Sequence, residues 1–185
     1  MKGISACVLF MGLSVLSAVS QIAIENAFVT IENETHINTD ELEFSPAFYK
    51  NGIVFVSSQS TTSTLGPQDR ESQFLSLFQA TRNAADELHD SSPFGEELRS
   101  DAHEGPLSFN QTGTKVYFTR NEETNVGKKK KEDVEPVRHL KIYSAELLSG
   151  QWGNVQELSF NEEDSNAAHP TISIDGNTLY FASDR

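Results

Sequence analysis

One stretch decides the fold: His169-Pro-Thr-Ile-Ser-Ile-Asp-Gly-Asn-Thr-Leu-Tyr-Phe-Ala-Ser183. It contains a proline, a short alternating run, a turn at Asp175-Gly176 and an apolar run that includes Tyr180 and Phe181. An Asp-Gly pair supplies the positive φ angles that a tight hairpin turn needs. Because the apolar run occupies consecutive positions, we expect a strand that is covered on both faces.

The same pattern occurs twice earlier in the chain, in Glu43–Ser57 and His103–Thr119. The apolar runs centre on phenylalanines with a regular spacing, since 63 residues separate Phe55 from Phe118 and 63 separate Phe118 from Phe181. A second pair of related segments starts at Leu75 and Leu140, 65 residues apart. The repeat is therefore longer than one hairpin, and such periods are typical of propellers and other repeat architectures.

Each complete unit is predicted to contain four strands. The third strand is expected at Phe74 to Ala80 and at Leu140 to Ala145, and the fourth near Ala84 to Leu88 and at Trp152 to Leu158. Four antiparallel strands with covered inner strands are typical of a propeller blade, because blades stack face to face around an axis. The prediction is an all-β, incomplete β-propeller: two four-stranded antiparallel blades (units 37–99 and 100–163) and the first hairpin of a third (164–185). Because closed propellers typically have about 4–8 blades, we expect the chain to be the front end of a larger protein.

The third unit resembles a known repeat. It follows the pattern H-P-x-x-S-x-D-G-x-x-L-Y-F-x-S-D-R of the WD-like β-propeller repeat of TolB-type proteins. The second unit is a diverged copy with one extra residue before its glycine. The matching residues, which the resemblance assigns to the structure of the repeat, are His103, Pro106, Gly113, Phe118, His169, Pro170, Asp175, Gly176, Tyr180 and Phe181.

The run from Ile37 to Arg185 is similar to the propeller region of exported OmpA-family proteins of the Gram-negative envelope. This resemblance implies a non-enzymatic interaction module, periplasmic or associated with the outer membrane. Its partners would be envelope proteins or cell-wall components, reached through the parent protein. In that family a peptidoglycan-binding domain follows the propeller, but nothing like it occurs in this sequence, so that activity is not transferred. Two alternatives remain: the propeller portion of an exported hydrolase or peptidase, and a TolB-like periplasmic protein that binds partners in its channel.

The first twenty residues have the anatomy of a cleavable secretory signal. Lys2 provides the positive start, an apolar run extends from Ile4 to Val19, and small residues precede Gln21. We expect a signal peptide at 1–20, a lead-in at 21–36, and no transmembrane segment in the mature chain, because the apolar run is shorter than a comfortable span. Cys7 lies inside the signal, so the mature chain has no cysteine and needs no disulfide.

The chain is acidic, with 27 Asp and Glu against 14 Lys and Arg and a formal net charge of −13. This balance argues against nucleic acid as a partner and against a general binder of anionic membranes, because phosphate binding needs a surplus of basic residues. One basic run, Lys128-Lys129-Lys130-Lys131, is a candidate interaction loop for an anionic partner. Acidic neighbours offset its charge, which favours a solvated loop.

Two histidines, His103 and His169, are candidates for a chemical role. We predict that His103 and His169 occupy matching repeat positions and that they are structural, because a residue required in every blade is rarely catalytic. Asp175 is predicted to serve the turn. The sequence contains no serine-nucleophile elbow, glycine-rich phosphate loop or recognisable metal motif, so no catalytic residue and no cofactor or metal is predicted. A glycosidase pair of carboxylates need not be close in sequence, and that chemistry stays open.

Overall fold

The computed structural model describes residues 31, 33–59, 74–123 and 138–185. The expected signal peptide at 1–20, most of the lead-in at 21–36 and the run Lys128-Lys129-Lys130-Lys131 lie outside these residues. The chain divides into two compact units, Met1–Asn33 and Glu34–Arg185. All the described strands belong to the second unit.

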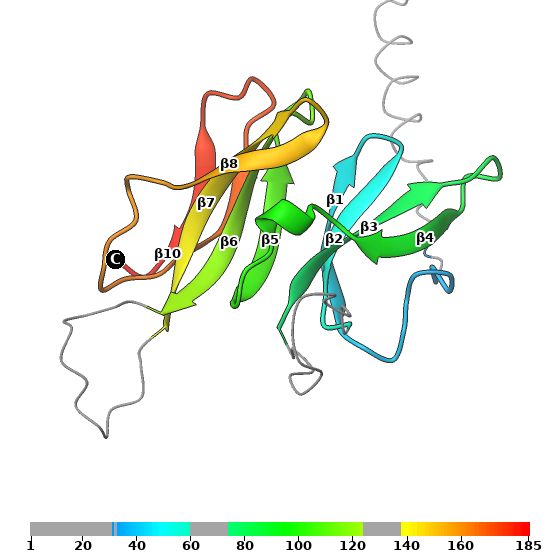
Figure 1. Ribbon diagram of the computed structural model, residues 1–185, viewed down its shortest axis with the longest axis horizontal. Helices are drawn as coiled ribbons and strands as arrows, with labels where there is room; N and C mark the ends of the chain where they lie inside the picture. The colour runs from blue at the N-terminus through cyan, green and yellow to red at the C-terminus, as the bar shows by residue number, and fades with distance from the viewer. Residues whose placement is uncertain (1–30, 32, 60–73, 124–137) are drawn as a thin grey trace, which may run out of the picture. The chain divides into compact units, whose positions relative to one another are not determined.

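The second unit is all-β and consists of three antiparallel sheets, none of them closed (Figure 1). The first sheet has the order β1 (Glu43–Tyr49), β2 (Gly52–Ser57), β3 (Ser76–Arg82), β4 (Leu88–Pro93). A short 3-10 helix, η1 (Glu96–Leu98), leads to the second sheet, with the order β5 (His103–Phe109), β6 (Lys115–Glu123), β7 (Arg138–Leu148), β8 (Gln151–Glu157). The third sheet pairs β9 (Ala167–Ile172) with β10 (Leu179–Ser183). The prediction of two four-stranded sheets followed by a hairpin is confirmed.

Two local predictions need correction. Asn51-Gly52 predicts the positive φ angles of a tight turn, but the loop of the first hairpin is Lys50-Asn51 and the positive φ, of 49°, belongs to Lys50. Gly52 is needed for another reason, since a Cβ there would run into the Ala80 carbonyl oxygen. The fourth strand of the first unit begins at Leu88, not near Ala84, because Asn83 closes a turn by accepting the backbone N–H groups of Ala85 and Glu87 at 2.8 and 3.0 Å.

The three hairpins share an irregularity at their prolines. Pairing with the second strand shifts register at this point in all three sheets. The residue before each proline has a left-handed φ, of 54° at Ser45, 92° at Gly105 and 56° at His169. A bulge of this kind bends the strand and strengthens its twist. The proline of the repeat therefore marks the bend that each first strand makes.

The main core lies between the first and second sheets. Val54, Val56 and Leu77 of the first sheet belong to one buried cluster with Leu107, Phe118 and other side chains of the second. A smaller cluster covers the opposite side of the first sheet, where Ile37 packs with Phe55, Phe78, Ala80 and Leu88. The third sheet lies over the second, with β9 in contact with β5, β6 and β7.

The repeated phenylalanines point in one direction through the three sheets. Phe55 faces away from the second sheet, because its neighbours Val54 and Val56 fill the intervening core. Phe118 belongs to that core and so faces the first sheet, whereas the next residue, Thr119, bonds to the third sheet. Phe181 stacks on Phe160, just after β8, with ring centroids 4.6 Å apart. Each ring therefore points toward the N-terminal side of its sheet in the order of the three sheets. A rotation or translation that relates each sheet to the next would produce this arrangement.

The core assignment predicts a large contrast between two Phe→Ala substitutions. Phe118 is fully buried, so Phe118→Ala should lower the free energy of unfolding by about 3–5 kcal/mol in urea denaturation. Phe48 is 85% exposed, and Phe48→Ala should cost less than about 1 kcal/mol. Equal costs at the two positions would contradict the packing of the second sheet on the first.

Candidate interaction site

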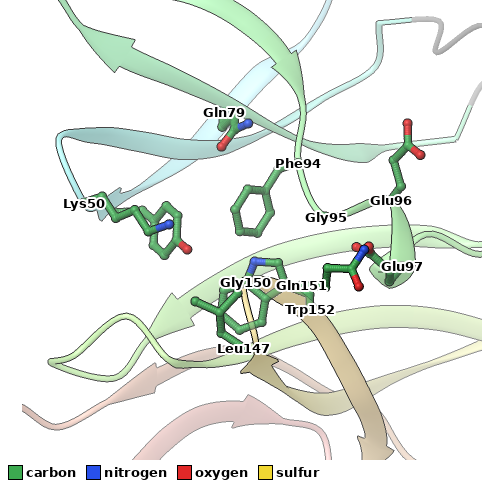
Figure 2. Close-up of a pocket in the computed structure, with 11 residues that line it drawn as sticks. Lys50, Gln79, Phe94, Gly95, Glu96, Glu97, Leu147, Gly150, Gln151 and Trp152 are labelled. Atoms are coloured by element: carbon green, nitrogen blue, oxygen red, sulfur yellow. The ribbon is translucent and has the colours of Figure 1, made fainter.

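A cavity of about 370 Å³ opens between the first and second sheets, at their hairpin end (Figure 2). The first sheet contributes the end of β1, the β1–β2 turn and the middle of β3, and the second contributes the β7–β8 hairpin; η1 and the segment before it close one side. The lining residues are Tyr49, Lys50, Gln79, Phe94, Gly95, Glu96, Glu97, Leu147, Gly150, Gln151 and Trp152.

The apolar wall of the cavity is part of the main core. Tyr49 stacks on Phe109 with ring centroids 4.5 Å apart and meets Phe94 edge-on at 5.3 Å. Trp152 lies against the same rings and is only 6% exposed. Its burial agrees with a packing role for this tryptophan, because a sugar platform needs an accessible ring face.

The rim of the cavity is polar and carries charges of both signs. Figure 2 shows Lys50 and Gln79 on the side of the first sheet and Gln151 on the side of the β7–β8 hairpin. Glu96 and Glu97 form the first turn of η1. The Lys50 ammonium lies 4.9 Å from the Tyr49 ring centroid, within cation–π range. The amide side chains of Gln79 and Gln151 can donate hydrogen bonds to, and accept them from, the main chain of a peptide. The apolar wall beside them could contact one of its side chains.

A second polar feature ties successive sheets together. The His103 ring accepts a hydrogen bond at Nδ1 from the backbone N–H of Leu75, at 3.0 Å. One sheet later, Asn166 Oδ1 accepts from the backbone N–H of Leu140, at 2.8 Å. Leu75 and Leu140 are the related residues of the third-strand repeat, so His103 corresponds to Asn166. Each acceptor connects the start of a new sheet to the preceding one.

The expected match of His103 with His169 is therefore wrong. His169 directly precedes Pro170 and occupies the bulge of β9, whereas three residues separate His103 from Pro106. The His169 side chain is exposed, and its backbone N–H donates to Thr119 Oγ1 at 3.0 Å. The two histidines lie in different environments, and only the ring of His103 takes part in the connection between sheets.

Beside His103 lies a buried ion pair that the sequence pattern did not indicate. Glu104 is 1% exposed, and its carboxylate accepts from Ser100 Oγ at 2.5 Å and lies 3.5 Å from Arg120 Nε. Arg120 also donates to the Leu98 carbonyl at 2.6 Å, which fixes η1 to β6. Burial raises the pKa of Glu104 to about 7, although the Ser100 hydrogen bond and the Arg120 charge act in the opposite direction. Desolvation thus outweighs the pairing.

The remaining repeat residues lie in turns and packing positions. Asp175 accepts from Ser173 Oγ at 2.5 Å and from the Asn177 N–H at 3.1 Å, as predicted for a turn residue, and these bonds lower its pKa. Gly113 and Gly176 have φ of 65° and 72°. Pro170 is buried, and Tyr180 is 63% exposed. The structure does not gather these residues into one site.

Comparison of the chain with protein-family models gives no match, and neither does comparison with curated protein sequences. The resemblance to TolB-type and OmpA-family propellers therefore remains a prediction based on the motif residues. Within the part of the chain that the structure describes, no helix has the length and apolar character needed to cross a membrane.

The burial of His103 makes stability sensitive to pH. Burial, and then the nearby Arg138 charge, lower the pKa of His103 below its usual 6.5. Below about pH 6.5, His103 is protonated in the unfolded chain but stays neutral in the folded chain until the pH reaches its lowered pKa. The free energy of unfolding should therefore decrease as the pH falls through this interval. His103→Asn copies the acceptor at Asn166 without titrating, so it should remove this loss. The measurement is urea denaturation between pH 7.5 and 5.

The comparison uses the difference between wild type and His103→Asn, in which the opposite contribution of Glu104 cancels. The two proteins should diverge as pH falls, with the variant the more stable at pH 5. His169→Asn is the matched control and should follow the wild-type curve. Parallel curves for wild type and His103→Asn would show that folding does not lower the pKa of His103.

Proposed function

We propose that this chain is an exported, non-enzymatic β-propeller segment of TolB type that acts as an interaction module in the Gram-negative cell envelope. Its parent would be an OmpA-family protein associated with the outer membrane. The motif His169-Pro-Thr-Ile-Ser-Ile-Asp-Gly supports the repeat family, and the residues before Gln21 support export.

One observation supports the propeller part of the proposal: the same spatial relation connects each sheet to the next. Phe55, Phe118 and Phe181 face the same side of the series, and Leu75 and Leu140 donate to corresponding acceptors of the next sheet. A two-sheet sandwich would bring equivalent faces together, so its repeated rings would point toward one another. Blades around an axis keep a constant direction, as these sheets do.

The interaction part of the proposal rests on the cavity between the first two sheets. Its apolar wall, two amide side chains and mixed charges favour a peptide segment of a partner over a polyanion. The site lies where the first and second sheets meet. The acidic chain as a whole also disfavours nucleic acid.

Photo-crosslinking in a Gram-negative host tests this function. The full chain carries p-benzoylphenylalanine in place of Gln151, at the rim of the cavity, or in place of Gln156, which is exposed on the same strand. We expect a light-dependent adduct with an envelope protein at position 151 and none at position 156. A chain without residues 2–20 should stay in the cytoplasm and form no such adduct.

The same experiment can contradict the proposal in two ways. If position 151 forms no adduct in exported protein, or the same adducts as position 156, the cavity is not a binding site. If the chain that lacks residues 2–20 forms the adduct equally well, the partner is not in the envelope. Lys50→Glu and Gln79→Ala should each weaken a genuine adduct, because both side chains line the cavity.

A further inference from the structure

Two histidines and a glutamate meet at the outer edge of the first sheet, away from the cavity. The ligand atoms of His36, Glu87 and His89 all lie within 4.8 Å of one another. The rings of His36 and His89 are stacked with centroids 4.3 Å apart, and Glu87 Oε2 lies 3.5 Å from His89 Nε2. The three side chains are exposed or partly exposed, so an ion could reach them from solvent.

The buried neighbours of these residues explain why they meet. Ile37 and Leu88 belong to the same small hydrophobic cluster, and they are only 6% and 3% exposed. Ile37 is further held by a turn in which its backbone N–H donates to the Glu34 carbonyl at 3.1 Å. Packing of Ile37 against the cluster therefore brings His36, its neighbour in sequence, to the two residues that flank Leu88.

Glu87 is oriented before any ion arrives. Asn83 Nδ2 donates to Glu87 Oε2 at 3.0 Å, and the backbone of Glu87 is bonded to Asn83 in both directions. Carboxylates that bind metals are commonly held by such outer hydrogen bonds.

We propose that His36, Glu87 and His89 form a binding site for a divalent transition-metal ion, with Zn²⁺ as the ion of choice. Two imidazoles and one carboxylate are a ligand set that zinc uses in sites with one position left to water. Nitrogen ligands disfavour Ca²⁺ and Mg²⁺, which prefer oxygen. This site is independent of the proposed function, since it lies outside the cavity and uses none of its residues.

Binding requires only a small local closure. Zinc with bonds of about 2.0–2.1 Å to tetrahedral ligands places the ligand atoms roughly 3.3 Å apart. The two stacked ring planes lie 27° from parallel, and the rings must turn so that one nitrogen of each faces the ion. His36 is exposed and can rotate, while Glu87 and His89 are held by strand β4 and by Asn83. The site is therefore half preformed, with His36 as the ligand that closes it.

Calorimetric titration of ZnCl₂ into the metal-free full chain, without a histidine tag, tests the proposal. We expect one equivalent of Zn²⁺ to bind and to raise the melting temperature. His36→Gln, His89→Gln and Glu87→Gln should each weaken binding at least about 10-fold, since even outer-shell changes at metal sites have effects of that size. Co²⁺ in place of Zn²⁺ should give visible absorption bands that disappear in the same variants.

His169→Gln is the matched control, because it removes another exposed histidine and should leave the affinity unchanged. All three ligand positions are at the surface or partly exposed, and near-UV circular dichroism checks that each variant is folded. Failure of the wild-type chain to bind Zn²⁺, or equal affinity in wild type and a folded His36→Gln/His89→Gln double variant, would overturn the proposal.

Discussion

The structure depends on the close contact between strand β5 and the face of the first sheet. At Gly105 the backbone of β5 approaches Val56 and Leu77 so closely that an added Cβ would clash with Val56 Cγ2 and lie 3.2 Å from Leu77 Cδ2. This approach brings Leu107 and Phe118 into the core of the first sheet. Burial of apolar surface at about 25 cal/mol per Å² makes such a contact the main stabilising term between the sheets.

The polar features of the molecule are arranged around that contact. His103 and Glu104 lie just before Gly105, and they connect β5 to Leu75 of the first sheet and to Arg120 of its own sheet. A buried ion pair is weak evidence for stability by itself, because desolvation of both charges opposes their attraction. Its position suggests a different role, in which it sets how the chain leaves η1 and enters the second sheet. The cavity follows from the same geometry, since it is the space that remains where the two sheets diverge at their hairpin ends.

Much of the fold could be predicted from local signals. Turn residues and consecutive apolar positions located the hairpins, and the 63-residue spacing of Phe55, Phe118 and Phe181 identified the units. The start of β4 was misplaced because the hydrogen bonds of Asn83, not hydrophobic periodicity, determine where that turn ends. The predicted equivalence of His103 and His169 is wrong, because the match rested on residue type alone. It did not take into account how far each histidine lies from the bulge at the proline. The burial of Glu104, the cavity, and the meeting of His36 with His89 all depend on contacts between distant segments, for which one sequence contains no signal.

The close contact at Gly105 is tested most directly by comparing Gly105→Ala with Gly150→Ala in urea denaturation. The two glycines have nearly equal left-handed φ, of 92° and 90°, so alanine meets strain of about 1–2 kcal/mol from φ at both. Gly105 also precedes Pro106, whose ring restricts the preceding residue further, so the coupling to Val56 is the deciding readout. A Cβ at Gly150 would contact nothing within 4 Å, whereas one at Gly105 would meet Val56. Gly105→Ala should cost about 1–3 kcal/mol more than Gly150→Ala, and Val56→Ala should recover part of the difference. Equal costs, with no coupling to Val56, would contradict the close contact on which the series of sheets depends.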